Sequence, residues 1–418
     1  MNRRGILISL IYCLATTLAP NLWAHPKEKV LYQFTGGADG GTPDSSLLMD
    51  ASGNLYGAAS YGGNFGGSCG SSGCGVVFEL SPSANGGWQE SVLYAFQSAP
   101  DGSGPNGNLL FDASGNLYGT TSSGGTSPHC GQGGCGTVFE LSSHAGSWTE
   151  KVLYNFQNTP DGARPAGLTF DAQGNLYGTS GGGSNTRGAV YKLSPPKPPR
   201  RKWTEKVLYS FSGFGVIPNA GIVLDPQGNL YGTYYNLDVQ FCGLGCGAVW
   251  ELKPAHGQWS ETDIYDFVGG GNGGQPDAGV IRDSHGNLYG TGAEGGNNFG
   301  MVFELSYSHG QWKEKMLHNF CSRNNCADGA FPLAGLVMDT SGSLYGTTYW
   351  GGSGCVYCGT VFKMTRVDHT WIETVLYNFL GGDGAGPYES LIVDSQGNLY
   401  GTAGNAGSGD GIVFEVMQ

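Results

Sequence analysis

The chain has 418 residues, of which 76 are glycine, 12% are aromatic and only 13% are charged, and its formal net charge is −13. This acidic balance disfavours nucleic acid and anionic lipid surfaces as partners, because both carry negative charge. The lack of a Gly-X-Y period excludes collagen, and the many Leu, Val, Phe and Tyr residues argue against disorder.

The N-terminus reads MNRRGILISLIYCLATTLAPNLWAHP. Two arginines precede an apolar run of about fifteen residues that ends near Ala24, which predicts a signal peptide over residues 1–24. The run is too short to anchor the chain in a membrane, and the bulky Tyr12 before Cys13 disfavours a lipoprotein cleavage site. We therefore expect an exported protein, secreted or periplasmic, without membrane insertion. Its mature part, residues 25–418, is predicted to form one domain.

One short phrase recurs seven times along the chain. DASGNLYG stands at 50–57 and 112–119, and close copies follow at 171–178, 225–232, 283–290, 339–346 and 394–401. Each copy belongs to a unit of four strand-like pieces, which in the third unit are GLTFD (167–171), NLYGTS (175–180), AVYKL (189–193) and WTEKVLYSF (203–211). The pieces are rich in β-branched and aromatic residues and lack a helical period. Four short strands per repeat predict an all-β fold, a seven-bladed β-propeller of four-stranded antiparallel blades.

The repeat is split between the two ends of the chain. The first VLYxF-like strand, KVLYQF (29–34), precedes the first hairpin, whereas the last unit stops at IVFEVMQ without its fourth strand. We expect the N-terminal strand to complete the last blade and close the ring, which removes free sheet edges. An open solenoid is the alternative, and the split repeat argues against it.

The recurring phrase lies between strands one and two of each predicted blade. Its Asp can accept backbone N–H bonds in an Asx-type turn, and Gly and Asn suit a tight hairpin. A calcium loop would need more oxygen ligands than this single carboxylate supplies. We interpret the phrase as scaffold. The Glu of each W-x-E motif is expected to start the outer strand and to pair there with a neighbouring Lys.

Ten cysteines besides Cys13 fall into five close pairs. Local pairing in an exported chain predicts disulfides, whereas a zinc site would need two pairs from different repeats brought together. The predicted disulfides are Cys69–Cys74, Cys130–Cys135, Cys242–Cys246, Cys321–Cys326 and Cys355–Cys358.

The complete unit reads DGxxPxxxLxxDxxGNLYGTTxxGG…GxVFEL…WxExVLYxF and is clearest at 101–156 and 328–379. In this pattern the chain resembles the GloVer tandem-repeat proteins, a bacterial exported family, over essentially all of its predicted mature part. The resemblance implies an exported repeat protein of propeller-like build. It carries over no catalytic residues.

In a propeller, the loops before strand one and between strands two and three share one face. These loops vary in length and hold every cysteine pair, and variable loops on a rigid scaffold usually carry binding. We call this side the cysteine face. Its aromatic residues are candidates for stacking on sugar rings, and the alternative is that they pack between blades. The candidates are Tyr234, Tyr235 and Phe241 in the fourth unit and Tyr349, Trp350 and Tyr357 in the sixth.

A second group of candidates follows a proline that recurs before strand one, where the chain should reach the mouth of the central channel. A polar ring there would hold a cation or a hydroxylated ligand. No His or Glu recurs at this position, and Leu333 and Tyr388 interrupt the ring, so a plain solvated channel is the alternative. The predicted polar residues are Asp44, Asn106, Asn219 and Asp277.

These features favour a non-enzymatic, exported binding or scaffolding protein. We expect a monomer without a cofactor, whose partner is a polysaccharide or a cell-surface protein. The alternative is a metal-dependent hydrolase or lyase of lactone or sugar substrates with its site at the central channel. A third possibility is a purely structural protein without a small ligand.

Overall fold

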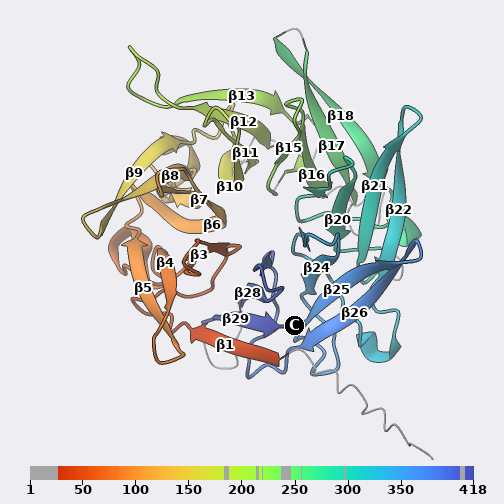
Figure 1. The fold of residues 1–418 in the computed structure, drawn as a ribbon. Coiled ribbons are helices and arrows are strands. Elements are labelled where there is room, and N and C mark those ends of the chain that lie inside the picture. The colour runs from red at the N-terminus through yellow and green to blue at the C-terminus, as the bar shows by residue number, and fades with distance from the viewer. Residues whose placement is uncertain are drawn as a thin grey trace, which may run out of the picture.

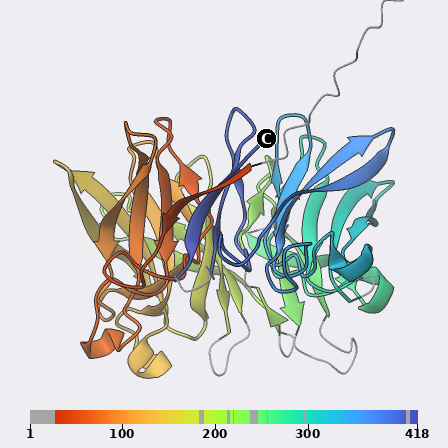
Figure 2. The ribbon, with the colours of Figure 1, turned by 90° about the horizontal axis from the view of Figure 1, so that it is seen from below.

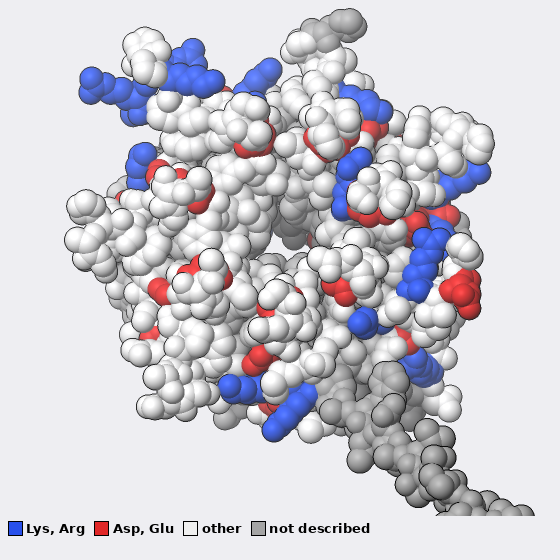
Figure 3. Space-filling view, viewed as in Figure 1, with Lys and Arg blue, Asp and Glu red and all other residues white. Residues whose placement is uncertain are grey.

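The computed structural model describes residues 27–182, 188–212, 216–218, 220–236, 246–255, 257–295, 298–404 and 410–418. They form seven antiparallel sheets around a central axis, so that the predicted seven-bladed β-propeller is confirmed (Figure 1). The inner strands surround a channel, which is visible as a hollow at the centre of Figure 3.

Strand two of each blade is largely buried, because neighbouring blades cover both of its faces, whereas strand one is only partly buried in most blades. Strand one, from blade one to blade seven, is β2 (Leu48–Met49), β6 (Gly102–Phe111), β10 (Ala163–Phe170), β14 (Val216–Ile217) with β15 (Val223–Leu224), β19 (Ile281–Arg282), β23 (Val337–Met338) and β27 (Ile392–Val393). Strand two is β3 (Leu55–Ala59), β7 (Leu117–Gly124), β11 (Leu176–Gly181), β16 (Leu230–Asn236), β20 (Leu288–Gly292), β24 (Leu344–Thr348) and β28 (Leu399–Ala403).

The two outer strands are longer than the inner ones in every blade except blades two and three. The outermost strand alternates between exposed and partly buried residues, as a half-solvated strand does. Strand three is β4 (Val76–Pro82), β8 (Thr137–His144), β12 (Ala189–Ser194), β17 (Cys246–Ala255), β21 (Met301–Ser308), β25 (Thr360–Val367) and β29 (Ile412–Met417). Strand four is β5 (Trp88–Ala95), β9 (Ser147–Asn155), β13 (Thr204–Ser210), β18 (Gln258–Phe267), β22 (Gln311–Asn319), β26 (Thr370–Asn378) and, for blade seven, β1 (Lys27–Gln33).

The N-terminal strand closes the ring. β1 pairs antiparallel with β29, from Lys27 opposite Met417 to Gln33 opposite Ile412. Phe34, which follows β1, is 1% exposed, and its ring meets that of Phe78 in blade one at a centroid distance of 5.0 Å. The split repeat therefore joins the two ends of the chain through both backbone pairing and core packing, as predicted.

The glycine of the LYG motif makes room for an aromatic ring. Gly57 lies opposite Phe78 in the register of β3 and β4, and a Cβ added to Gly57 would stand 2.5 Å from the tip of that ring. The same arrangement recurs in blade six, where Gly346 lies opposite Phe362. Any larger residue would push the ring out of the core, which explains why glycine ends the motif.

The Asp of the recurring phrase organises its hairpin, as the scaffold interpretation predicts. In blade two, one oxygen of Asp112 accepts hydrogen bonds from the backbone N–H of Ser114 at 2.8 Å and of Asn116 at 2.9 Å. The other oxygen accepts from the Asn116 amide at 2.8 Å and from the hydroxyl of Tyr118 at 3.2 Å. Burial alone would raise the pKa of Asp112, but these donors outweigh it and hold the pKa below its usual value. The carboxylate is thus saturated by its own hairpin.

Replacing this carboxylate should destabilise the fold. We expect Asp112→Ala to lower the free energy of unfolding by about 2 kcal/mol, because four donors lose their acceptor together. Ser114→Ala is the matched control, since the Ser114 side chain is exposed and only its backbone N–H reaches the Asp. Chemical denaturation measures both variants. Equal stability of Asp112→Ala and the control would contradict the scaffold role.

A threonine after LYG links neighbouring blades. The hydroxyl of Thr179 donates to the carbonyl oxygen of Ala220 in the next blade at 2.9 Å, and Thr291 donates to that of Ala334 at 2.8 Å. Ala220 and Ala334 precede the innermost strands of their blades and line the channel. These hydrogen bonds therefore help to fix the wall of the channel.

Candidate functional site

The cysteine-bearing loops gather on one side of the ring. Figure 2 shows the short 3-10 turns η1 (Gly67–Cys69) and η2 (Pro128–Gly133) at the lower edge, away from the long outer hairpins. Four of the predicted disulfides are confirmed: Cys69–Cys74, Cys130–Cys135, Cys321–Cys326 and Cys355–Cys358. Cys242 lies outside the described residues, so the Cys242–Cys246 pair stays a prediction. Two further turns, η3 (Gly270–Asn272) and η4 (Asn324–Cys326), connect consecutive blades.

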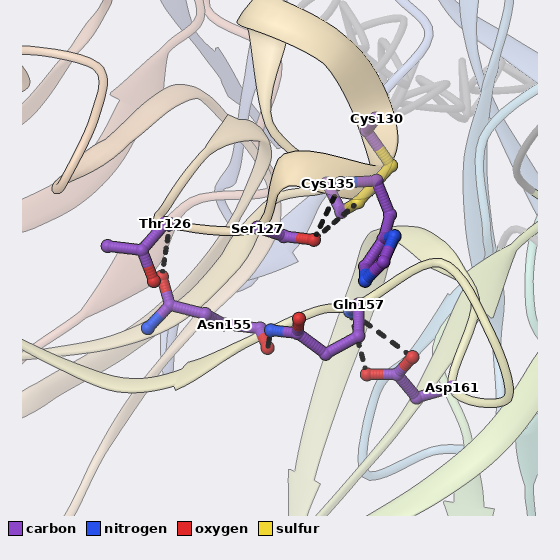
Figure 4. Close-up of a disulfide and its surroundings, with 8 residues drawn as sticks. Thr126, Ser127, Cys130, Cys135, Asn155, Gln157 and Asp161 are labelled. Atoms are coloured by element: carbon purple, nitrogen blue, oxygen red, sulfur yellow. Dashed lines mark hydrogen bonds between the residues drawn. A yellow bond between two sulfur atoms is a disulfide. The ribbon is translucent and has the colours of Figure 1, made fainter.

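Side chains of the outer strand fasten these loops to the blade (Figure 4). Beside the Cys130–Cys135 disulfide, the Asn155 side-chain oxygen accepts a hydrogen bond from the backbone N–H of Thr126 at 2.9 Å. Ser127 accepts one from the backbone N–H of His129 at 3.3 Å. The loops are therefore held in place by hydrogen bonds as well as by the disulfide.

A continuous series of six aromatic rings crosses the cysteine face of blades five to seven. Tyr357 contacts Trp350 at 5.3 Å between ring centroids, Trp350 contacts Tyr349 at 5.8 Å, and Tyr349 contacts Tyr388 at 6.4 Å. Phe331 packs against Trp350 at 4.9 Å between ring centroids, and Phe299 packs in turn against Phe331 at 5.8 Å. We call this set the aromatic series.

The aromatic series runs from solvent to the channel. Tyr357 is 66% exposed and Trp350 is 37% exposed, whereas Tyr388 lines the central channel. Val356, the chain neighbour of Tyr357, is 70% exposed. Leu380, which approaches Gly354 of the same disulfide loop, is 66% exposed and adds to the apolar surface. An exposed apolar stretch of this kind, on one side of the ring, marks a candidate interaction site.

The backbone around the aromatic series is rigidly tied. Trp350 and Ala330 exchange two backbone hydrogen bonds of 2.9 and 2.8 Å, and the N–H of Gly352 donates to the carbonyl oxygen of Cys326 at 2.8 Å. The loop that carries the Cys355–Cys358 disulfide is thereby attached to the loop that carries Cys321–Cys326. Rings presented on such a frame lose little conformational freedom when a ligand binds.

The aromatic candidates of blade four lie in different surroundings. Tyr234 and Tyr235 belong to the strand β16 rather than to a loop, so their side chains point to opposite faces of the sheet. Tyr234 packs against Phe211 at 5.5 Å and donates a hydrogen bond to Asp263 at 2.9 Å, whereas Tyr235 lines the channel. Phe241 lies outside the described residues.

The central channel encloses a cavity of about 630 Å³ whose walls come from the segments leading into strand one. Asp44, Asn106 and Asp277 line it, at the position that the recurring proline predicts, together with Leu333 and Tyr388. Asn219 lies outside the described residues. None of the described residues of the wall is Lys, Arg or His.

Close contacts between inner strands fix the width of the channel. Gly167 has φ of 53°, and a Cβ at this residue would stand 2.6 Å from the Cα of Gly221 in the next blade. A Cβ on Gly279 would likewise approach the carbonyl oxygen of Gly221 to 2.7 Å. Only glycine allows the backbones to approach this closely.

Two carboxyl groups, those of Asp44 and Glu389, lie near each other where blades seven and one join, and Glu389 was not among the residues predicted from the sequence. Asp44 accepts a hydrogen bond from Ser60 at 2.6 Å, and its other oxygen is buried without a partner among the described residues. Glu389 accepts one from Ser46 at 3.2 Å. Burial raises the pKa of Asp44 to about 6 and that of Glu389 to about 7, and the charge of Asp44 adds to the second shift. Each carboxyl group can accept hydrogen bonds from the hydroxyl groups of a ligand, and the raised pKa of both favours the protonated forms more than at an exposed site.

The remaining polar residues of the wall are arranged differently. Burial raises the pKa of Asp277 to about 6, and the negative charge of Glu294 contributes. The side chain of Asn106 is already engaged, since its amide donates to the carbonyl oxygen of Pro165 at 3.3 Å and its oxygen lies 3.3 Å from the hydroxyl of Thr120. Across the described residues, no three His, Cys, Asp or Glu side chains gather closely enough to hold a metal ion.

Two further observations concern the location of the protein. Four disulfides are consistent with an extracellular or periplasmic location, where such bonds persist. In the part of the chain that the structure describes, no helix has the length and apolar character needed to cross a membrane.

Solved structures share this architecture at low sequence identity. The polysaccharide lyase Uly1 has a TM-score of 0.53 at 10% identity, with 90% of each chain covered. A putative oxidoreductase (glucose dehydrogenase) from Thermus thermophilus has a TM-score of 0.49 at 14% identity, with 94% of this chain and all of the other covered. At such identities the likeness extends to the fold alone. No curated protein matches the sequence.

Family assignment rests on the repeat itself. The model of the Gloeobacter/Verrucomicrobia repeat matches residues 24–244 and again 241–418, two spans that together cover all the blades. The matched spans contain the D-x-x-G-N hairpins, the glycine–aromatic pairs and the closing strand described above. The chain therefore belongs to the Gloeobacter/Verrucomicrobia repeat family.

Proposed function

We propose that this propeller is an exported, non-enzymatic binding protein that recognises a polysaccharide through its cysteine face. The observation that carries the proposal is the aromatic series, which leads without interruption from the exposed Tyr357 to Tyr388 in the channel wall. Aromatic faces cover the C–H faces of sugar rings well, and Trp and Tyr are the residues that most often anchor such contacts.

The chemistry at the inner end of the aromatic series indicates what kind of sugar chain would bind. Asp44, Asp277 and Glu389 offer carboxylate acceptors to sugar hydroxyl groups, and no basic side chain is found among the described residues of the wall. Acidic sugars would be repelled there. A neutral, hydroxyl-rich polysaccharide is therefore the expected ligand of this face.

A double variant tests the proposal. We expect Trp350→Ala with Tyr357→Ala to weaken binding of a neutral polysaccharide at least about tenfold, because two stacking surfaces are lost. Tyr307→Ala is the matched control, since Tyr307 is 60% exposed but lies on the β21–β22 hairpin, away from the cysteine face. Affinity electrophoresis against a panel of neutral polysaccharides measures all three proteins. Binding that survives in the double variant would place the glycan site elsewhere and overturn the proposal.

A hydrolase or lyase acting on lactones or sugars is the second candidate, and the pair Asp44 and Glu389 favours it. Two neighbouring carboxyl groups with raised pKa values suit general acid and base roles. Turnover of a lactone or polysaccharide that disappears in both Asp44→Asn and Glu389→Gln would support this function. Metal analysis of the purified protein and of Asp44→Asn would show whether a metal ion takes part. Glycan binding without turnover would favour the binding protein.

A further inference from the structure

Blade three carries two lysines directly opposite each other, where three other blades carry a pair of opposite charges. Lys192 on β12 lies opposite Lys206 on β13. At the same place, Glu140 faces Lys151 in blade two, Glu304 faces Lys315 in blade five, and Glu415 faces Lys29 in blade seven. Like charges at directly opposed positions destabilise a sheet. An anion beside the two lysines would remove this cost.

The two lysines belong to a groove between blades three and four. The groove is lined by alternate residues of β12 and β13, by the loop that joins these two strands, and by Trp259 of β18. The groove has a volume of about 390 Å³, within the range of small-ligand sites. Its lining residues are Lys192, Ser194, Pro195, Lys197, Arg200, Thr204, Lys206, Leu208 and Trp259, and none of them is acidic.

Most of the positive charge in this groove is not neutralised by the protein. Lys192 lies 3.8 Å from Asp171 and above the ring of Tyr177. Lys197, Arg200 and Lys206, by contrast, have no carboxylate within 4 Å among the residues that the structure describes. Figure 3 shows the basic residues gathered at the tip of the β12–β13 hairpin, on a chain whose net charge is −13.

We propose that this groove, which we call the basic groove, binds an acidic saccharide, a sugar ring that bears a carboxylate or sulfate group. The cations would hold the acid group, Ser194 and Thr204 offer hydroxyls to the sugar, and Trp259 with Leu208 supplies an apolar wall for its C–H face. A flat lipid surface cannot enter such a groove. The β12–β13 hairpin lies on the side opposite to the cysteine face, so this site is independent of the aromatic series.

Three charge-removing substitutions test the basic groove. The variant Lys197→Gln, Arg200→Gln, Lys206→Gln should bind immobilised polygalacturonate or dextran sulfate at least about tenfold more weakly than the unchanged protein. The control Lys313→Gln, Lys315→Gln, Arg366→Gln removes the same charge from exposed positions of blades five and six and should bind normally. Trp259→Phe should weaken binding to the sugar polymers while the protein keeps its melting temperature.

Other outcomes would overturn the assignment. No retention of the unchanged protein on either sugar polymer at low salt excludes the site. Equal losses in the groove variant and the control mean that only net charge matters. Polyglutamate, which carries carboxylates but no sugar rings, should bind clearly more weakly than polygalacturonate. If it binds as tightly, and the same three residues are needed, the ligand is an acidic peptide instead.

Discussion

Stability should be greatest at mildly acidic pH and should fall as the pH rises from about 4.5 towards 7. The cause is a glutamate that recurs in the outermost strand of every blade, as the Glu of the W-x-E motif in six of them. In each one, an oxygen of the carboxyl is buried and has no hydrogen-bond partner among the described residues. The seven residues are Glu28, Glu90, Glu150, Glu205, Glu261, Glu314 and Glu373.

Most of these glutamates also face a second carboxylate across a blade junction. Burial raises the pKa of Glu150 to about 8, and the negative charge of Asp101, which follows the outer strand of the preceding blade, contributes. Asp101 in turn accepts a hydrogen bond from Tyr94 at 3.0 Å. Glu90 with Asp39 and Glu205 with Asp161 repeat the arrangement, with pKa values of about 7 for both glutamates. Each junction therefore favours the protonated glutamate.

The direction of the effect follows from proton linkage. A carboxyl whose pKa is higher in the folded than in the unfolded state binds a proton more tightly when folded. Its contribution to stability is fully present below the unfolded pKa near 4.5 and is lost as the pH rises through the folded pKa, which is about 7 for Glu90 and Glu205 and about 8 for Glu150. The hairpin aspartates act in the opposite sense, because folding lowers their pKa. Their contribution to stability is present above the usual pKa of an aspartate and is lost as the pH falls below it.

Replacing Glu150 by Gln should mimic the protonated state. At pH 8.5 we expect Glu150→Gln to raise the melting temperature by several degrees, whereas near pH 4.5 it should change little. Thr149→Ala, on the exposed side of the same strand, is the control and should leave the pH profile unchanged. Differential scanning calorimetry from pH 4 to 9 measures the profile. A flat profile, or a loss of stability in Glu150→Gln at pH 8.5, would contradict the argument.

The repeat pattern allowed the fold to be predicted, but it hid residues that occur only once. The position of Glu389 in the other units holds small residues, such as Ser45, Gly107 and Ala278, so nothing in the repeat drew attention to it. Tyr388 stood out as an interruption of a polar ring, whereas in the structure it ends the aromatic series. A residue that occurs in only one unit of the repeat is a candidate for function, because the scaffold does not require it.

Other features depended on register and burial, which the sequence does not supply. Lys192 belongs to the sequence VYKL, which stands where the first, second and fifth units have VFEL. Only the pairing of β12 with β13 shows that Lys206 lies opposite it. The predicted surface pairs between the W-x-E glutamates and lysine are wrong. Only Glu373 has a cationic partner, Arg323 at 2.6 Å, among the described residues, and the other six face buried surroundings or carboxylates. The alternation of polar and apolar residues along one strand does not reveal which of its side chains a neighbouring blade covers.

Deletion of residues 27–34 should prevent stable folding altogether. The deletion removes six backbone-paired residues of β1 and the side chains of Leu31 and Phe34, which are 7% and 1% exposed. Truncating a single buried side chain of this size costs about 2–5 kcal/mol, and the net stability of a folded protein is only about 5–15 kcal/mol. The loss would also expose the free edge of β29, a template for aggregation. Circular dichroism and size-exclusion chromatography should show unfolded or aggregated protein.

A circular permutant tests whether β1 must precede blade one in the chain or only has to pair with β29. The C-terminal Met417 lies opposite Lys27, so residues 27–34 can follow Gln418 through a short turn such as the His309-Gly310 turn of blade five. A chain that begins at Thr35 and ends with this appended strand contains seven complete blades in sequence. We expect it to fold with nearly the melting temperature of the unpermuted protein, because the closing contacts are the same. A truncated chain that folds as well as the permutant would mean that the ring does not need its closing strand. If neither folds, the covalent link between Phe34 and blade one is itself required, and closure by pairing is insufficient.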